Sequence, residues 1–189
     1  QMCIRDRSTA SGGFLFGAMS FLLPRYFEIH LASLSTNVAI TGIFAGIVYA
    51  CASFAQVAIG WLIDRISPRL VLFWISIGQV IFIYLASQFE NLSLFFLSIA
   101  AMSFVFGQIP ITDTILVRYV PDNWRSRVLS AKFLLNLCIG ASVLPFTSYL
   151  LKIGYDLKMI FTFASFTAIG VLFSSVILPS QGKQLNPNI

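Results

Sequence analysis

Six apolar stretches, separated by short polar or charged gaps, run along most of the chain. Their approximate bounds are 12–31, 37–63, 70–87, 93–117, 128–151 and 158–178. Each stretch holds about 18–27 residues, the length that a helix needs to cross a bilayer with some tilt. None shows the short segments of alternating polarity that a membrane β-barrel requires. The pattern therefore predicts an all-α integral membrane protein with six transmembrane helices.

The composition agrees with this prediction. Hydrophobic residues make up 58% of the 189 residues and charged residues only 10%, whereas soluble domains hold roughly 45–50% apolar and about 25% charged residues. So few polar groups could not coat a water-soluble globule of this size. Six spans also leave no room for a soluble catalytic or nucleic-acid-binding domain. The net charge of +5 is therefore not a sign of nucleic acid, and the expected surroundings are a lipid bilayer.

The two ends of the chain differ in character. Residues 1–7 have no initiator methionine at position 1 and no signal-peptide pattern, and their letters MCIRDR resemble a translated sequencing adapter. We expect these residues to be non-native and the natural chain to continue upstream. Residues 180–189 are polar, follow Pro179 and form an expected cytoplasmic tail. Residues 8–179 then hold the six predicted helices.

The distribution of Lys and Arg predicts the orientation. With six spans, both ends lie on one side of the membrane together with the gaps 64–69 and 118–127. Without residues 1–7, that side carries Arg65, Arg69, Arg118, Arg125, Arg127, Lys132 and Lys183. The opposite side carries Arg25, Lys152 and Lys158. Because cytoplasmic segments hold the excess of Lys and Arg, both ends are expected in the cytoplasm.

Metal and cofactor chemistry has little support in the sequence. Cys3, Cys51 and Cys138 match no metal-binding or redox spacing, and His30 is the only histidine. No Gly-rich loop ending in Lys-Ser/Thr is present to cradle a phosphate. We therefore expect neither a bound metal nor a cofactor.

A charged loop, residues 60–69 with the sequence GWLIDRISPR, joins the second and third stretches. Gly60 could let a neighbouring backbone approach closely. Asp64 could cap, or face, the positive N-terminal end of an adjacent helix. Arg65 and Arg69 could pair with an acid on a neighbouring helix or with lipid phosphates. Such a loop would hold two helices together at the cytoplasmic face.

The spacing of this loop resembles the signature of the major facilitator superfamily, roughly G-x-L-x-D-R-x-G-R-K. The matching residues are Gly60, Leu62, Asp64 and Arg65. Ser67 and Pro68 depart from the family's glycine and next basic residue, and Arg69 keeps the final charge. The later segment 107–127 is also similar to the tenth helix and following cytoplasmic loop of bacterial members.

This resemblance implies the C-terminal six-helix half of a twelve-helix bacterial carrier, truncated at its N-terminus. The implied activity is secondary active transport of a small solute by alternating access in the bacterial inner membrane. The missing N-terminal six-helix half would be the partner. In such carriers each half is an inverted three-plus-three repeat, here 12–87 against 93–178. The candidate cavity residues point to a polar or anionic organic solute.

Asp113 is the sharpest single feature, because acids inside a membrane span are costly and mark functional sites by default. It lies about five residues from the cytoplasmic loop, or about 7–8 Å along a helix. That depth favours a structural or gating salt bridge to Arg65, Arg69 or Arg118 over a proton-coupling carboxylate. The predicted gating residues are Gly60, Asp64, Arg65, Arg69, Asp113 and Arg118.

Uncharged polar residues within the spans either link helices or line a wet cavity. The resemblance implies that the first, second, fourth and fifth stretches face the cavity. The candidate lining residues are Ser20, Arg25, Gln56, Gln108 and Asn136, with Phe16 as a weaker candidate. Gln79, on the third stretch, is predicted to link helices instead.

Backbone features give two further expectations. Pro24 is predicted to break the first helix near its outer end, since proline lacks a backbone donor and clashes in a helix interior. Beyond it, Arg25 and Glu28 could pair on one face, and Arg25 would either attract an anionic substrate or belong to an interfacial anchor. Two pairs of glycines four residues apart are expected to let helices pack closely. These pairs are Gly13 with Gly17 and Gly42 with Gly46.

Two alternatives remain open. A six-span intramembrane enzyme would need a nucleophile with a base, or a metal pair, inside the spans. The chain has no Gly-x-Ser-x-Gly, no His-Glu-x-x-His and no Asp-Asp pair. A complete six-helix carrier that acts as a dimer is the other alternative, and a start codon just before Ser8 would favour it.

Overall fold

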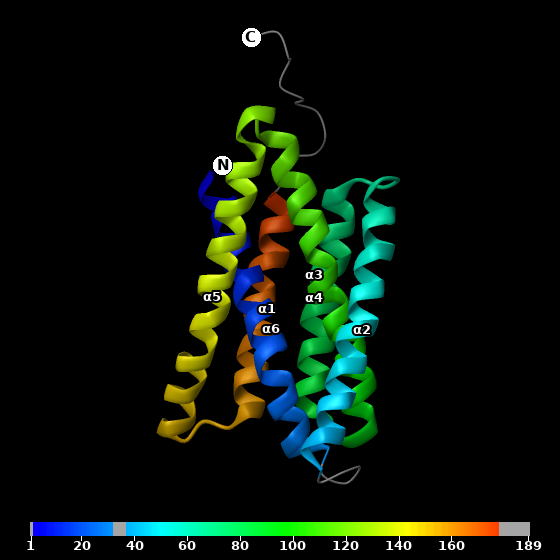
Figure 1. Cartoon of the computed structure of the whole chain (residues 1–189), viewed down its shortest axis with the longest axis vertical. Helices are drawn as coiled ribbons and strands as arrows, with labels where there is room; N and C mark the ends of the chain where they lie inside the picture. Colours follow the sequence, from blue (N-terminus) through cyan, green and yellow to red (C-terminus); the bar gives the residue numbers. More distant parts are fainter. Residues whose placement is uncertain (1, 32–36, 178–189) are drawn as a thin grey trace.

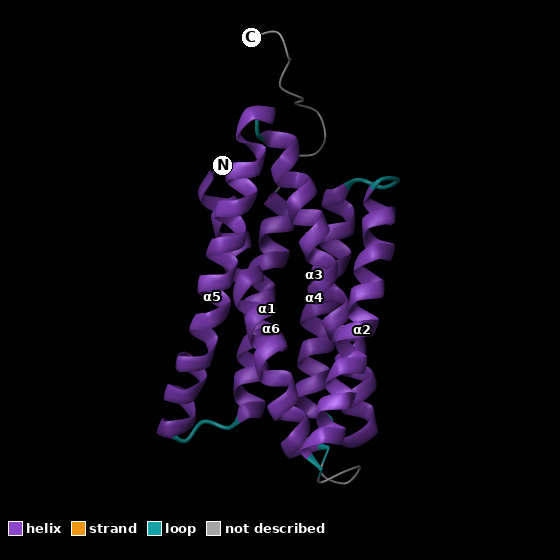
Figure 2. Cartoon of the chain, viewed as in Figure 1, coloured by secondary structure: helices purple, strands orange, loops and turns teal. Residues whose placement is uncertain are grey.

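The computed structural model describes residues 2–31 and 37–177, and the side chains of residues 2–10, 118–119 and 174–177 are outside this description. The helices are α1 (Met2–His30), α2 (Val38–Ile63), α3 (Pro68–Gln88), α4 (Asn91–Tyr119), α5 (Arg125–Ile153) and α6 (Leu157–Ile177). A single 3-10 turn, η1 (Asp122–Trp124), precedes α5. The helices lie side by side in one bundle, with their long axes roughly parallel (Figures 1 and 2).

The all-helical fold class is confirmed, and no strand occurs within residues 2–31 and 37–177. The helix bounds lie within a few residues of the predicted apolar stretches, except that α1 begins at Met2, inside the segment expected to be non-native. The segments 38–63, 68–88, 91–117 and 122–153 are each long and apolar enough to cross a membrane. These four helices indicate a membrane protein, while six crossings stay a prediction. The expected tail, 180–189, lies outside the described residues.

The predicted break at Pro24 is wrong, because α1 continues through this residue to His30. Proline leaves the carbonyl four residues earlier without its usual helical donor, and here that carbonyl belongs to Ser20. The Tyr49 hydroxyl, on α2, donates a hydrogen bond to this oxygen at 2.7 Å. A neighbouring helix therefore supplies the missing donor, which is how membrane helices tolerate interior prolines.

The helix ends follow ordinary local rules. Asn37 caps α2 by accepting a hydrogen bond from the Ala39 amide at 2.9 Å. Pro68 opens α3 at a first-turn position, where its missing N–H costs nothing. Gly154 ends α5 with a φ of 100°, a left-handed conformation that glycine adopts without a Cβ penalty. The short gaps between helices therefore come from capping chemistry as well as from polarity.

Two three-helix segments, α1–α3 and α4–α6, repeat one packing pattern. In the first segment, α2 and α3 both pack against α4 of the second segment. In the second segment, the equivalent helices α5 and α6 both pack against α1 of the first. The equivalent helices α3 and α6 also pack against each other, as do α1 and α4. In Figure 1, α1 runs from the upper to the lower end of the bundle and α4 runs in the opposite direction. The arrangement is that of an inverted three-helix repeat.

The glycine pairs behave differently from one another. A Cβ added to Gly17 would lie 2.4 Å from the Gly140 Cα, so α1 and α5 cross here with almost no space between their backbones. By contrast, a Cβ at Gly42, Gly46 or Gly60 would meet nothing within 4 Å. The expected close packing is therefore wrong for these three positions, which lie on the sparsely buried α2.

Candidate ligand cavity

A cavity of about 310 Å³ lies between α1, α4 and α5. Its lining residues are Gly12, Phe16, Val105, Gln108, Ile109, Thr112, Asp113, Leu129, Lys132, Phe133, Asn136 and Leu137. Each of the three helices that form it carries an interior proline, namely Pro24, Pro110 and Pro145. The cavity thus lies between the two repeats, with α1 from the first and both α4 and α5 from the second.

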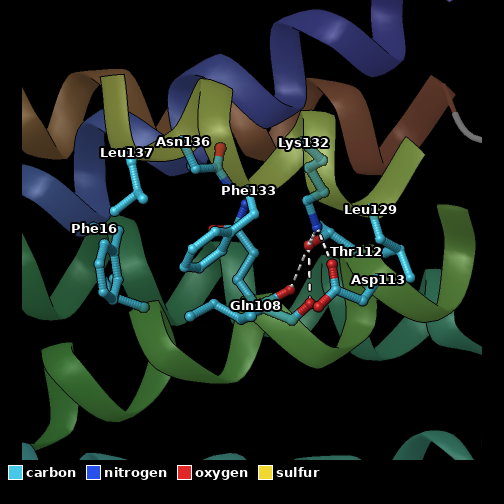
Figure 3. A pocket seen from close by; sticks show the side chains of 12 residues that line it. Phe16, Gln108, Thr112, Asp113, Leu129, Lys132, Phe133, Asn136 and Leu137 are labelled. Carbon is cyan, nitrogen blue, oxygen red and sulfur yellow. Dashed lines mark hydrogen bonds and ion pairs between the residues drawn. The ribbon is translucent and has the colours of Figure 1, made fainter. Parts of the chain in front are cut away.

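One end of the cavity holds an ion pair (Figure 3). The Lys132 Nζ donates to Asp113 Oδ1 at 2.5 Å and to Thr112 Oγ1 at 2.7 Å. The Lys132 side chain is 10% exposed, whereas that of Asp113 is 42% exposed. Lys132 comes from α5 and the other two residues from α4. The pair therefore joins two helices while leaving part of the carboxylate accessible.

The buried side-chain amide of Gln108 also lines the cavity, and Gln79 holds it in place. Gln79, on α3, donates from Nε2 to Gln108 Oε1 at 2.8 Å and to the Phe104 carbonyl at 3.1 Å. The Gln108 Nε2 points toward Gly12, where an added Cβ would lie only 2.7 Å away. Gln79 thus links helices, as the sequence predicts, and in doing so fixes the orientation of the Gln108 amide in the cavity wall.

Asn136 places a second amide in the wall. Its Oδ1 is buried and finds no hydrogen-bond partner among the described residues. An added Cβ at Gly13 would lie 2.9 Å from this oxygen, so the amide is pressed against the α1 backbone. Gly13 therefore makes room for Asn136, just as Gly17 makes room for Gly140 one turn along.

The rest of the wall is apolar. Phe16, Phe133 and Leu137 lie toward the end opposite the ion pair (Figure 3). Phe16 also packs against Phe106, with ring centroids 5.3 Å apart. The cavity is therefore amphipathic. The ion pair and Leu129 lie at one end, and the amides of Gln108 and Asn136 lie among aromatic and aliphatic side chains toward the other (Figure 3).

The structure brings together Gln108, Asp113 and Asn136, and with them the weaker candidate Phe16. Ser20, Arg25 and Gln56 lie outside this cavity. Ser20 faces α2 through its backbone, and its hydroxyl is buried without a partner in the described part of the chain. Arg25 is exposed at the other end of the bundle, paired with Glu28 at 2.5 Å. Gln56 is half-buried on α2.

The predicted gating loop is exposed. Asp64 ends α2 and its residue is open to solvent, so it caps no helix start within the described structure. The Arg65 guanidinium lies over the Trp61 ring, 3.9 Å from its centroid. Arg69 is half-buried in the first turn of α3. Arg118 lies near the end of α4, and its side chain falls outside the described residues.

Lys132 is the site residue that the sequence reasoning missed. It entered only the count of basic residues for orientation, although it lies inside the predicted 128–151 stretch. A cation within an apolar stretch carries the same signal as Asp113. The structure pairs it with Asp113, so the described partner of this acid comes from α5. The sequence analysis expected Arg65, Arg69 or Arg118, of which the Arg118 side chain lies outside the described residues.

A second ionic cluster occupies the opposite end of the bundle. The Lys158 Nζ donates to Glu90 Oε1 at 2.5 Å, and His30 Nδ1 lies 3.6 Å from the same oxygen. The hydrogen bond from Lys158 and its positive charge hold the pKa of the Glu90 carboxyl below its ordinary value. This cluster ties the α3–α4 turn to α1 and α6, far from the cavity.

Comparison with known proteins finds no family model and no curated protein that matches the chain. The family resemblance therefore stays a prediction that rests on residues 60–69 and 107–127. Within residues 2–31 and 37–177, no three His, Cys, Asp or Glu side chains gather into a group that could hold a metal ion.

Proposed function

We propose that the chain is half of a secondary transporter of the major facilitator type, which moves a small polar organic solute by alternating access. The observation that carries this proposal is an amphipathic cavity with an intramembrane ion pair, lying between two inverted three-helix segments. Inverted repeats with a solute site at their interface are the common plan of secondary carriers.

The backbone of the cavity helices supports the same proposal. Interior prolines weaken the hydrogen-bond ladder of α1, α4 and α5, while α2 and α6 contain none and α3 has one only at its start. Kinks and bends in helices concentrate at such residues. The three helices that surround the solute are therefore the ones best able to change shape as the cavity opens and closes.

The proposed orientation places the end with Arg65, Arg125 and Arg127 in the cytoplasm, with both chain ends on that side, since Lys and Arg concentrate there. Six crossings and a bacterial inner membrane are part of this proposal. A second six-helix half would complete the cavity from the side that this chain leaves open. The exposed apolar side chains of α2 and α5 that lie outside the cavity, such as Phe54 and Leu134, suit contact with lipid or with that half.

The test is whether water-soluble reagents reach the cavity from both sides of the membrane. Phe133→Cys, in a background where Cys3, Cys51 and Cys138 are serine, should react with a membrane-impermeant thiol reagent in right-side-out and in inside-out vesicles. Alternating access predicts labelling in both, because the cavity opens to each side in turn. Labelling from one side only, or from neither, would overturn the proposal that the protein is a transporter.

Two control positions make the labelling interpretable. Phe96→Cys, on an exposed apolar face of α4 outside the cavity, should stay unlabelled from either side. Tyr155→Cys, in the α5–α6 connection, should be labelled from the outer side alone. A sequencing read upstream of the codon for Ser8 then separates a half carrier, which continues into further apolar spans, from a six-helix carrier that begins there and forms a dimer.

A further inference from the structure

We infer that the cavity takes a small zwitterion with an apolar body, of the kind represented by an aliphatic or aromatic α-amino acid. This inference rests on the proposed function, because it names the substrate class of the same cavity. It is carried by the charge balance of the Lys132–Asp113 pair, by the donors and acceptors that the pair still offers, and by the apolar remainder of the wall.

Charge balance is the first step. Lys132 and Asp113 together are neutral, and Lys132 is nearly buried. A ligand with one net charge would leave that charge uncompensated beside the pair, and an unpaired buried charge is strongly unfavourable. A zwitterion adds one charge of each sign and keeps the cavity neutral. A singly charged organic ion would need a second ion or a proton to enter with it.

The available hydrogen-bonding groups are the second step. An ammonium has three N–H donors, and Lys132 uses two of them on described residues, Thr112 and Asp113. A third donor therefore remains for a ligand carboxylate. The Asp113 side chain is 42% exposed, so its carboxylate can accept from a ligand ammonium. The four charges then alternate in sign around a ring, with each cation between two anions.

The apolar wall is the third step. Beyond the ion pair and the two amides, the cavity is lined by Phe16, Val105, Ile109, Leu129, Phe133 and Leu137. The part of the cavity that this chain forms measures about 310 Å³, at the lower end of the roughly 300–1,000 Å³ of small-molecule pockets. A side chain without charge or strong polarity suits this surface. A sugar, with hydroxyls on every face, would leave most of its hydrogen bonds unmade.

The test compares ligands that differ only in charge. The full-length gene product containing this chain, purified in detergent, is titrated by equilibrium dialysis with L-phenylalanine, 3-phenylpropanoate and 2-phenylethylamine. A second set consists of L-leucine, 4-methylpentanoate and 3-methylbutylamine. In at least one set, the zwitterion should bind at least roughly tenfold more tightly than both singly charged analogues, since losing one partner of a buried charge pair costs at least this factor. Equal binding within both sets, or no binding in either, overturns the inference.

Two variants give a readout that a merely structural ion pair would not. Asp113→Asn leaves Lys132 as an excess cation, so the preference should move toward the carboxylate analogue. Lys132→Gln leaves Asp113 as an excess anion, so the preference should move toward the amine. Lys158→Gln breaks an ion pair of equal length at the far end of the bundle and should keep the zwitterion preference. Uniform loss of all ligands in the first two variants, without opposite shifts, overturns the inference.

The outcomes separate this inference from the proposed function. If Phe133→Cys is labelled from both sides but the zwitterion is not preferred, the proposed substrate class is rejected and the proposal of transport is retained. If the zwitterion binds but Phe133→Cys is labelled from one side only, the proposal of transport is rejected and the assignment of the ligand site is retained.

Discussion

Tyr49 shows how one hydroxyl can keep a proline-containing helix continuous. It donates to the Ser20 carbonyl, the oxygen that Pro24 deprives of its helical donor. In a membrane no water is present to replace such a donor, so a neighbouring helix must supply it. At the residue scale, the bond matters because it joins α1 to α2, two helices that otherwise make few contacts.

Removal of this hydroxyl should therefore destabilise the protein. Tyr49→Phe leaves the Ser20 carbonyl without a donor, and hydrogen bonds between membrane helices contribute about 0.6–1.7 kcal/mol. We expect the free energy of unfolding in detergent to fall by about that amount. Tyr84→Phe, which removes the hydroxyl of an exposed tyrosine on α3, should have no effect. An equal loss in both variants would contradict this assignment.

At the residue scale, the sequence identified some of the site residues but not the contacts between them, and the reasons are physical. Asp113, Gln108 and Asn136 could be singled out because polar groups inside apolar stretches are conspicuous. The partner of Asp113 could not, because Lys132 and three arginines were all within plausible reach and only the helix packing selects among them. The hydrogen bond that compensates for Pro24 was also beyond prediction, since its donor, Tyr49, comes from another helix.

At the scale of helices, α1 and α5 cross in close contact. Gly17 and Gly140 meet there backbone to backbone, one turn from the contact between Gly13 and Asn136. The sequence indicates glycine pairs but does not say which of them face another helix. The pair on α2 shows this limit, because its positions face open space.

Gly17→Ala should be poorly tolerated. The new methyl group would lie 2.4 Å from the Gly140 Cα, so the helices must move apart, and overpacking of this kind costs roughly 1–3 kcal/mol. Gly46→Ala is the matched control on α2. It should be neutral or stabilising by up to about 1 kcal/mol, the difference in helix propensity. Thermal unfolding of both variants in detergent tests this contrast, which equal melting temperatures would refute.

The outer cluster should make stability depend on pH in the acid range. Because Lys158 lowers the pKa of Glu90 below 4.5, the folded state holds the ionised carboxylate more firmly than the unfolded state does. The stabilisation is complete above pH 4.5 and disappears as the pH falls through the lower, folded-state pKa. Unfolding midpoints of the wild type and Glu90→Gln should therefore differ most above the ordinary pKa of a glutamate and converge only below the lowered, folded-state pKa of Glu90. A constant difference at all pH values would exclude this linkage.

At the scale of the whole molecule, the two three-helix segments and the charge at the ends of the bundle belong together. The apolar stretches alone predict six helices with good bounds, because length and hydropathy determine them. They do not predict which helices touch, and the two segments show no convincing identity in sequence. Before the structure, the inverted repeat could therefore be expected only from the family resemblance, and the helix contacts now support it.

The orientation of the bundle can be measured directly. An alkaline phosphatase domain, which is active only outside the cytoplasm, should be inactive when inserted after Ile66 and active when inserted after Tyr155. The reason is the excess of Lys and Arg at the end of the bundle that holds Ile66. Activity at both positions, or the reverse pattern, would refute the proposed orientation.

The inverted repeat also has a consequence for insertion into the membrane. The connection between α2 and α3 has Arg65 and Arg69 in or beside it, and the equivalent connection between α5 and α6 has Lys152 and Lys158 beside it. The two middle connections thus carry the same number of basic residues, although the proposed orientation places them on opposite sides of the membrane. The excess of Lys and Arg comes instead from the α4–α5 connection, with Arg118, Arg125 and Arg127. A common three-helix ancestor would have had to enter the bilayer in both directions. In the present chain, the direction of the second copy would follow from the basic α4–α5 connection rather than from its own middle connection.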